Sequence, residues 1–175
     1  PERYKIYLSY GASNAEYVQT ERSDVVFGLS WGSGRMYYNP SHPRFNDVGF
    51  NIMNTHELAH WVDYHFVQAD RRQGFWDAIL NAEKTVTEHY AEFHRFCKEN
   101  DREGFLSDIL SGFCRGVRDF PFGHPAKYWA DNPDAQPHET LANLFGLYAF
   151  GDEKQIKFLA QNFPEVVREF EAIEL

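Results

Sequence analysis

The segment His56-Glu57-Leu58-Ala59-His60 constrains this chain more than any other feature of its sequence. Two histidines four residues apart are separated by about 40° around a helix axis, so both imidazoles can reach one ion from the same face. Glu57 would then lie beside such an ion, in position to take a proton from a bound water. The motif therefore predicts a helix with two metal ligands, His56 and His60, and a general base, Glu57.

The spacing of apolar and turn residues around the motif predicts an α+β domain. A small N-terminal mixed sheet is expected, with strands over Arg3–Tyr10, Val25–Ser30 and Arg35–Tyr38. Helices are expected over Gly49–Ala69, Phe75–Glu99, Leu106–Leu110, His138–Phe150, Glu153–Phe158 and Pro164–Ile173. The stretch Gly104–Pro137 is rich in Gly and Pro and is otherwise expected to be loop, and such long irregular stretches are usually functional.

Length and charge limit the classes of protein to consider. With 175 residues, 43% of them hydrophobic, the chain fits one domain over residues 1–175 with a substantial core. Its net charge of −9 has the wrong sign for a protein that binds phosphate backbones, so no nucleic acid partner is expected. No membrane association is expected either, since no apolar window approaches the length of a membrane helix. A soluble protein is predicted, cytoplasmic or virion-associated.

The two cysteines and the first residue give only weak indications of compartment and processing. Cys97 and Cys114 are too few for a disulfide scaffold and lack CxxC spacing, which favours a reducing compartment but leaves open whether they pair. The chain begins at Pro1 rather than Met, which is typical of an excised domain or a processed product.

A third metal ligand has to come from outside the motif. A catalytic zinc is held by three protein ligands and keeps one position open for water. Glu139, near the start of the predicted helix His138–Phe150, is the best candidate by residue type. An acid in a first helical turn is also common because it complements the helix dipole. The residues alone therefore leave the role of Glu139 open.

Two longer motifs resemble a known superfamily. The sequence HELAHWVD of His56–Asp63, followed by ETLANLFGLYAF of Glu139–Phe150, resembles the gluzincin side of the zincin metallopeptidases. It is similar to the anthrax lethal factor-like peptidase domain, whose helices carry HExxHxxD and ExxAxxF. Ser107–Ile109, GHPAKYW of Gly123–Trp129 and ETLANLF also resemble the zincin-like domain of phage minor head (head morphogenesis) proteins. A zincin-like fold is implied from about Arg35 onward.

Carried over position by position, the resemblance implies roles for five residues. Glu139 becomes the third zinc ligand. Asp63, on the helix face of both histidines, suits a carboxylate that fixes an imidazole tautomer, and is otherwise an exposed helix acid. Asn143 stands where many gluzincins have an acid, and still offers a hydrogen bond. His124 and Tyr128 are candidate donors to the developing oxyanion, with plain aromatic packing as their alternative.

The remaining histidines have no ligand spacing to the motif and are assigned no role: His42, His65, His89, His94 and His138. Among these, His138 is notable because it is adjacent to Glu139.

The resulting hypothesis is a Zn²⁺-dependent peptidase that hydrolyses protein or peptide substrates through a metal-activated water, with Glu57 as general base. An extended substrate would align along the strand Gly34–Tyr38 as a sheet edge. Two alternatives stay open: a metal-binding module that cleaves nothing and assembles with phage structural proteins, or a toxin or effector peptidase domain. Glu57 argues against a purely structural metal site, which gains nothing from that carboxylate.

Overall fold

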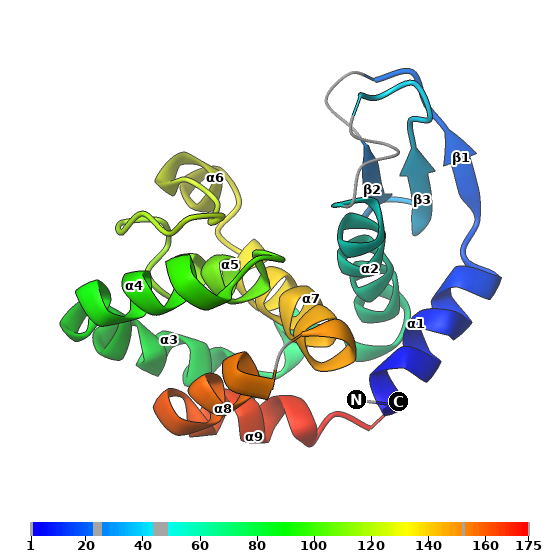
Figure 1. The fold of residues 1–175 in the computed structure, drawn as a ribbon. Coiled ribbons are helices and arrows are strands. Elements are labelled where there is room, and N and C mark those ends of the chain that lie inside the picture. Colours follow the sequence, from blue (N-terminus) through cyan, green and yellow to red (C-terminus); the bar gives the residue numbers. More distant parts are fainter. Residues whose placement is uncertain (1, 23–25, 44–48, 152, 175) are drawn as a thin grey trace.

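The computed structural model describes residues 2–22, 26–43, 49–151 and 153–174, and it has the predicted α+β architecture (Figure 1). A small three-stranded sheet lies near the N-terminus, and the rest of the described chain is mainly helical. In chain order the elements are α1 (Glu2–Asn14), β1 (Tyr17–Gln19), β2 (Phe27–Ser30), β3 (Arg35–Tyr38), α2 (Gly49–Val62), the π-helical segment η1 (Asp63–Val67), the 3-10 segment η2 (Ala69–Arg71), α3 (Gln73–Glu88), α4 (Tyr90–Asn100), α5 (Phe105–Phe113), α6 (Ala126–Asp131), α7 (Ala135–Phe150), α8 (Glu153–Asn162) and α9 (Pro164–Glu171).

The first predicted strand, Arg3–Tyr10, is wrong, because this segment belongs to helix α1. Its apolar residues alternate, but only Tyr4 and Leu8, four residues apart, are buried, whereas Ile6 and Tyr10 are exposed. The helical spacing therefore decides the structure. The ring of Tyr4 stacks on Phe170 with ring centroids 5.0 Å apart, which joins the N-terminal helix to the C-terminal one.

The sheet is mixed, in the order β1-β3-β2. Strand β3 pairs in parallel with β1 and antiparallel with β2, where Leu29 lies opposite Met36. The strand expected to be a free edge is therefore the middle strand, and that prediction is wrong. The reason is β1, a three-residue strand with mostly exposed side chains, which is too short to show a strand pattern in the sequence.

The helices differ from prediction mainly at their ends. The helix expected over Phe75–Glu99 is broken at His89 into α3 and α4, which lets Phe93 and Phe96 of α4 pack on Phe158 of α8. In the expected loop, α5 is a full helix and α6 is a further one. The carboxylate of Asp101 accepts hydrogen bonds from the backbone N–H groups at the start of α5, which satisfies donors that a helix start leaves free.

Helices α5 and α7 form the centre of the core, with α2 packed on the other side of α7. Both central helices are buried on nearly all sides, which explains why their sequences are apolar beyond a single stripe. The largest fully buried side chains are Phe75, Phe93, Phe105, Phe113, Phe145, Phe170, Met36, Ile79, Leu106, Ile109, Leu110 and Leu141. Cys97 and Cys114 are both buried free thiols, so the pairing left open by the sequence does not occur.

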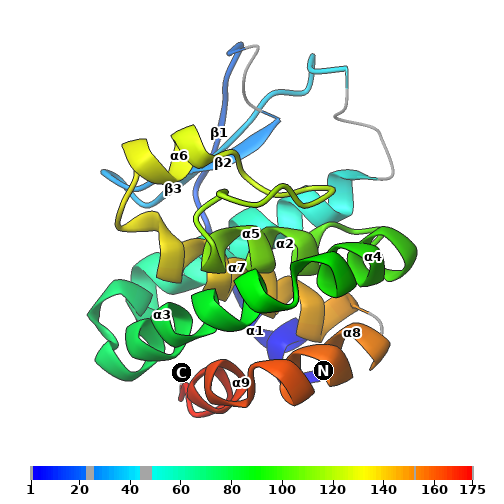
Figure 2. The same cartoon turned by 90° about the vertical axis from the view of Figure 1, so that its left-hand side faces the viewer.

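The sheet and α6 lie at the same end of the molecule, away from α8 and α9, in both views (Figures 1 and 2). Trp31, which follows β2, and Tyr128 and Asp131 of α6 line one cleft of about 430 Å³. The floor of this cleft includes Glu139 of α7. The fold therefore brings the predicted third ligand into a cleft between the sheet and α6.

Candidate metal centre

Three side chains from two helices converge at this cleft. The Nε2 atoms of His56 and His60 are 3.0 Å apart, and they lie 3.2 and 3.4 Å from Oε2 of Glu139. Between the two histidines on α2, Leu58 and Ala59 are buried and anchor this turn of the helix in the core. The three residues together form a group that could hold a metal ion.

The spacing of these atoms and their lack of other partners fit a divalent cation. Ligands about 2.0–2.1 Å from a tetrahedral zinc lie about 3.3 Å from each other, close to the three distances found here. Oε2 of Glu139 is buried and, within the described structure, no donor meets it in hydrogen-bond geometry, although both imidazoles lie near it. A buried carboxylate oxygen without a donor is costly, so an ion at this point would supply the missing partner.

The charges within this group are strongly coupled. Burial lowers the pKa of His56, but the adjacent Glu139 carboxylate, with the charges of Glu57 and Asp108, outweighs it and raises that pKa to about 9. Burial raises the pKa of the Glu139 carboxyl, but His60 and His56 outweigh it and hold that pKa well below its usual range. In the metal-free chain at neutral pH, a negative carboxylate therefore faces a protonated imidazole, and an incoming cation would replace that proton.

Glu57 lies beside the three ligands and is held by the sheet. Its Oε2 accepts a hydrogen bond of 3.1 Å from the backbone N–H of Leu29 in β2, which leaves its other oxygen free to meet a water. Burial raises the pKa of Glu57. A raised pKa brings a carboxylate closer to the range in which it can both accept and return a proton near neutral pH.

Tyr128 and His124 also reach this site. The Tyr128 hydroxyl donates a hydrogen bond to Oε1 of Glu139, and burial together with the Glu139 charge raises the pKa of Tyr128, so the hydroxyl stays protonated. His124 stacks on the Tyr128 ring at 4.0 Å, and its Nδ1 lies 2.7 Å from Oδ1 of Asp108. Tyr128 thus fixes the carboxylate of Glu139. The contact with Asp108 uses Nδ1 of His124, so that Nε2 is the ring nitrogen available to a bound molecule.

Asn143 contacts the site as expected, through His56. Its Oδ1 lies 3.2 Å from Nδ1 of His56, and its Nδ2 donates to Oδ2 of Asp108 and to the backbone oxygen of Glu139, each at 2.8 Å. Asn143 therefore links His56 to Asp108 of α5 and to the backbone of α7.

Asp63 lies elsewhere than expected. Its Oδ1 accepts from the backbone N–H of Ala69 at 2.8 Å and its Oδ2 lies 2.5 Å from Nδ1 of His138, whereas Nδ1 of His60 has no hydrogen-bond partner in the described chain. The prediction that Asp63 orients a ligand imidazole is not supported by these contacts. The α-helix widens to a π-helix at Asp63, which displaces its side chain from the face that His56 and His60 share.

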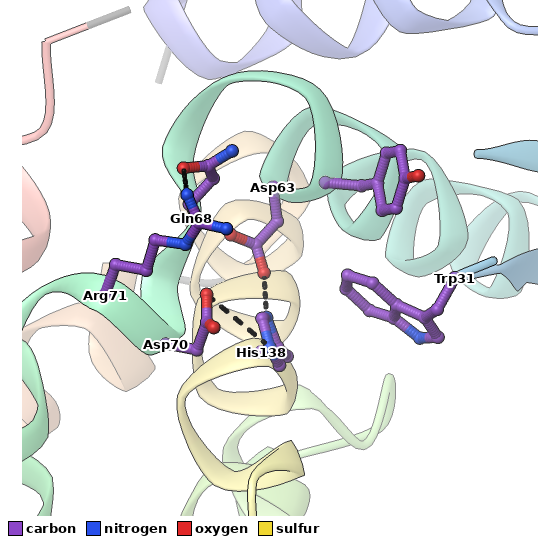
Figure 3. A pocket seen from close by; sticks show the side chains of 7 residues that line it. Trp31, Asp63, Gln68, Asp70, Arg71 and His138 are labelled. Carbon is purple, nitrogen blue, oxygen red and sulfur yellow. Dashed lines mark hydrogen bonds and ion pairs between the residues drawn. The ribbon is translucent and has the colours of Figure 1, made fainter. Parts of the chain in front are cut away.

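His138 lies in a pocket next to the centre (Figure 3). Asp63 holds one side of its ring, Asp70 lies 3.9 Å from the other nitrogen, and the ring of Trp31 lies at 4.6 Å. The Trp31 ring also lies 5.5 Å from that of His60. This pocket thus borders the centre on the side away from His124.

Two residues near the centre were missed from the sequence. Asp108 lies on α5, within the segment Ser107–Ile109 that was noted only for its resemblance and given no role, and Trp31 lies in a turn between strands, without spacing to the motif. Asp108, His124 and Glu139 are also close enough to form a second metal-ligating group. However, both oxygens of Asp108 already accept N–H hydrogen bonds from His124 and Asn143, which makes a second ion there less favourable.

Comparisons with family models, curated proteins and solved structures gave no match. The resemblance to zincins therefore rests on the residues and stays a prediction. Within the described ranges, no helix has both the length and the apolar character that crossing a lipid bilayer requires.

Proposed function

We propose that this chain is a zinc-dependent peptidase. The observation that carries the proposal is the convergence of His56 Nε2, His60 Nε2 and Glu139 Oε2, with Glu57 beside them. Two imidazoles and a carboxylate also suit iron(II). Zinc and hydrolysis are favoured because Glu57 lies next to the ligands, where a carboxylate serves to activate water.

When bound, the zinc ion would polarise a carbonyl group and acidify a water molecule. Glu57 would take the proton of that water with its free carboxylate oxygen and pass it to the leaving amine. The hydrogen bond from Leu29 fixes the Glu57 side chain in the orientation this transfer needs. His124 would stabilise the developing negative charge with an N–H from the Nε2 side, since Asp108 holds the opposite nitrogen.

Two clefts flank the centre, and together they offer room for an extended peptide. One cleft of about 410 Å³ is lined by His56, Met53, Phe122 and His124, and another of about 430 Å³ by Glu139, Tyr128 and Trp31. We propose β2 as the strand along which substrate lies, since its outer edge faces Glu57. The Leu29 carbonyl points to the same side as its N–H and would accept a backbone hydrogen bond from substrate.

Cleavage of an unstructured protein by the zinc-loaded chain tests the proposal, with new amino termini as the readout. Glu57→Gln should keep zinc and lose turnover by about 10²–10⁴-fold, the usual contribution of general base catalysis. Metal analysis should give one zinc per parent chain, and much less for His56→Ala or Glu139→Ala. Equal cleavage by the parent and Glu57→Gln would refute the assignment of Glu57. Tight zinc binding without cleavage would instead favour a non-catalytic metal-binding module.

A further inference from the structure

We infer that Asp108 is a positioning residue for the metal centre, which acts on His56 through Asn143 and on His124 directly. This inference rests on the proposed metal site. Asp108 lies on α5, whereas the ligands lie on α2 and α7, so a third helix takes part in orienting the site.

The amide of Asn143 can take only one orientation. Its side-chain nitrogen faces two groups that only accept, Oδ2 of Asp108 and the backbone oxygen of Glu139, each at 2.8 Å. Its oxygen must therefore face Nδ1 of His56, at 3.2 Å. An amide oxygen only accepts, so Nδ1 of His56 has to carry a proton. The lone pair of Nε2 is then the one available to a metal.

The second oxygen of Asp108 orients His124. Both the backbone N–H and Nδ1 of His124 approach Oδ1 of Asp108, at 3.0 and 2.7 Å. With the Asn143 amide on Oδ2, the carboxylate accepts from three donors in total. Asp108 and Asn143 are only 6% and 3% exposed, so water has little room to replace a lost partner.

An amide cannot replace this carboxylate. In Asp108→Asn the single oxygen can face either His124 or Asn143, and the new NH₂ group then faces a donor on the other side. The backbone N–H of His124 cannot turn, whereas the amide of Asn143 can. We therefore expect Asn143 to turn and to present its nitrogen to His56. This favours the wrong imidazole tautomer for binding through Nε2.

Zinc affinity of the metal-free chain, measured by competition with a chelator, tests the inference. Asp108→Asn should weaken zinc binding about 10–100-fold, the usual effect of losing a partner of a metal ligand. Asp101→Asn is the matched control. It makes the same change in a buried carboxylate that holds the start of α5 and does not contact the site, so zinc affinity should not change.

The exchanged pair gives the sharper test. In Asp108→Asn combined with Asn143→Asp, the new asparagine offers its oxygen to His124 and its nitrogen to the new aspartate, which accepts from Nδ1 of His56. The bond to the Glu139 backbone oxygen is lost, and a carboxylate oxygen faces that acceptor instead. The double variant should recover most of the affinity lost in Asp108→Asn, whereas a merely structural role for Asp108 predicts additive losses.

Nitrogen NMR of the zinc-loaded parent protein gives a readout that needs no variant. His56 should carry its proton on Nδ1 and bind through Nε2, and coordination through Nδ1 would overturn the inference. Unchanged affinity in Asp108→Asn, or a double variant no better than that single one, would also overturn it. A parent chain that does not bind zinc would refute the proposed function itself, which is a distinguishable result.

Discussion

Replacing Glu139 by Gln should remove the charge that keeps His56 protonated in the metal-free chain. Glu139, with smaller contributions from Glu57 and Asp108, raises the pKa of His56 from 6.5 to about 9 against the opposing effect of burial. At about 1.4 kcal/mol per pH unit, this interval corresponds to about 3 kcal/mol of folding free energy. The lowered pKa of Glu139 describes the same interaction from the other side, so the contribution is counted once.

The sign of the effect follows from the direction of the shift. A histidine whose pKa is raised on folding contributes stability that is fully present below about pH 6.5 and is lost as the pH rises through about 9. The difference in free energy of unfolding between the parent and Glu139→Gln should therefore change by about 3 kcal/mol between about pH 6 and about pH 10. Urea unfolding with a chelator present measures it, and the NMR titration of His56 should move from about 9 to lower pH.

Glu92→Gln is the matched control for this experiment. Glu92 also lies beside a histidine, His89 at 3.9 Å, but both side chains are more than half exposed and water screens their interaction. This variant should show no measurable pH-dependent difference from the parent. If His56 titrates at the same pH in the parent and in Glu139→Gln, or if their difference in stability is constant with pH, the coupling argued here is wrong.

Three further predictions concern the packing of the core and the hydrogen bond from Tyr128 to Glu139. Gly146→Ala should lower the free energy of unfolding by about 1–3 kcal/mol in urea, because the new Cβ would lie 2.5 Å from the ring of Phe105. Leu141→Ala should lower it by about 2–5 kcal/mol, since this side chain is fully buried, and a smaller loss would show that the helices close over the cavity. Tyr128→Phe should weaken zinc binding in a chelator competition, because it removes the hydroxyl that holds Glu139, and an unchanged affinity would assign Tyr128 to packing alone.

The sequence predictions were accurate where interactions between neighbouring residues decide the structure, and less accurate where contacts between distant segments decide it. The helix with His56, Glu57 and His60 was predictable because helix geometry alone puts the two histidines on one face. The segment Arg3–Tyr10 was not, because its alternation fits a strand and only packing against α2 and α7 shows which residues are buried. Likewise, β3 is the central strand because β1, which the sequence did not predict, pairs with its other edge.

By itself, the sequence determined the local half of the site: two imidazoles and a carboxylate presented by one helix. The tertiary structure decided the rest, since it brings Glu139 to the two imidazoles across 79 residues and directs Asp63 to His138 instead. It also brings Asp108 of α5 to Asn143, a contact between residues 35 positions apart. The physical reason is that helical periodicity acts over a few residues, whereas the meeting of α2, α5 and α7 depends on how their buried faces pack.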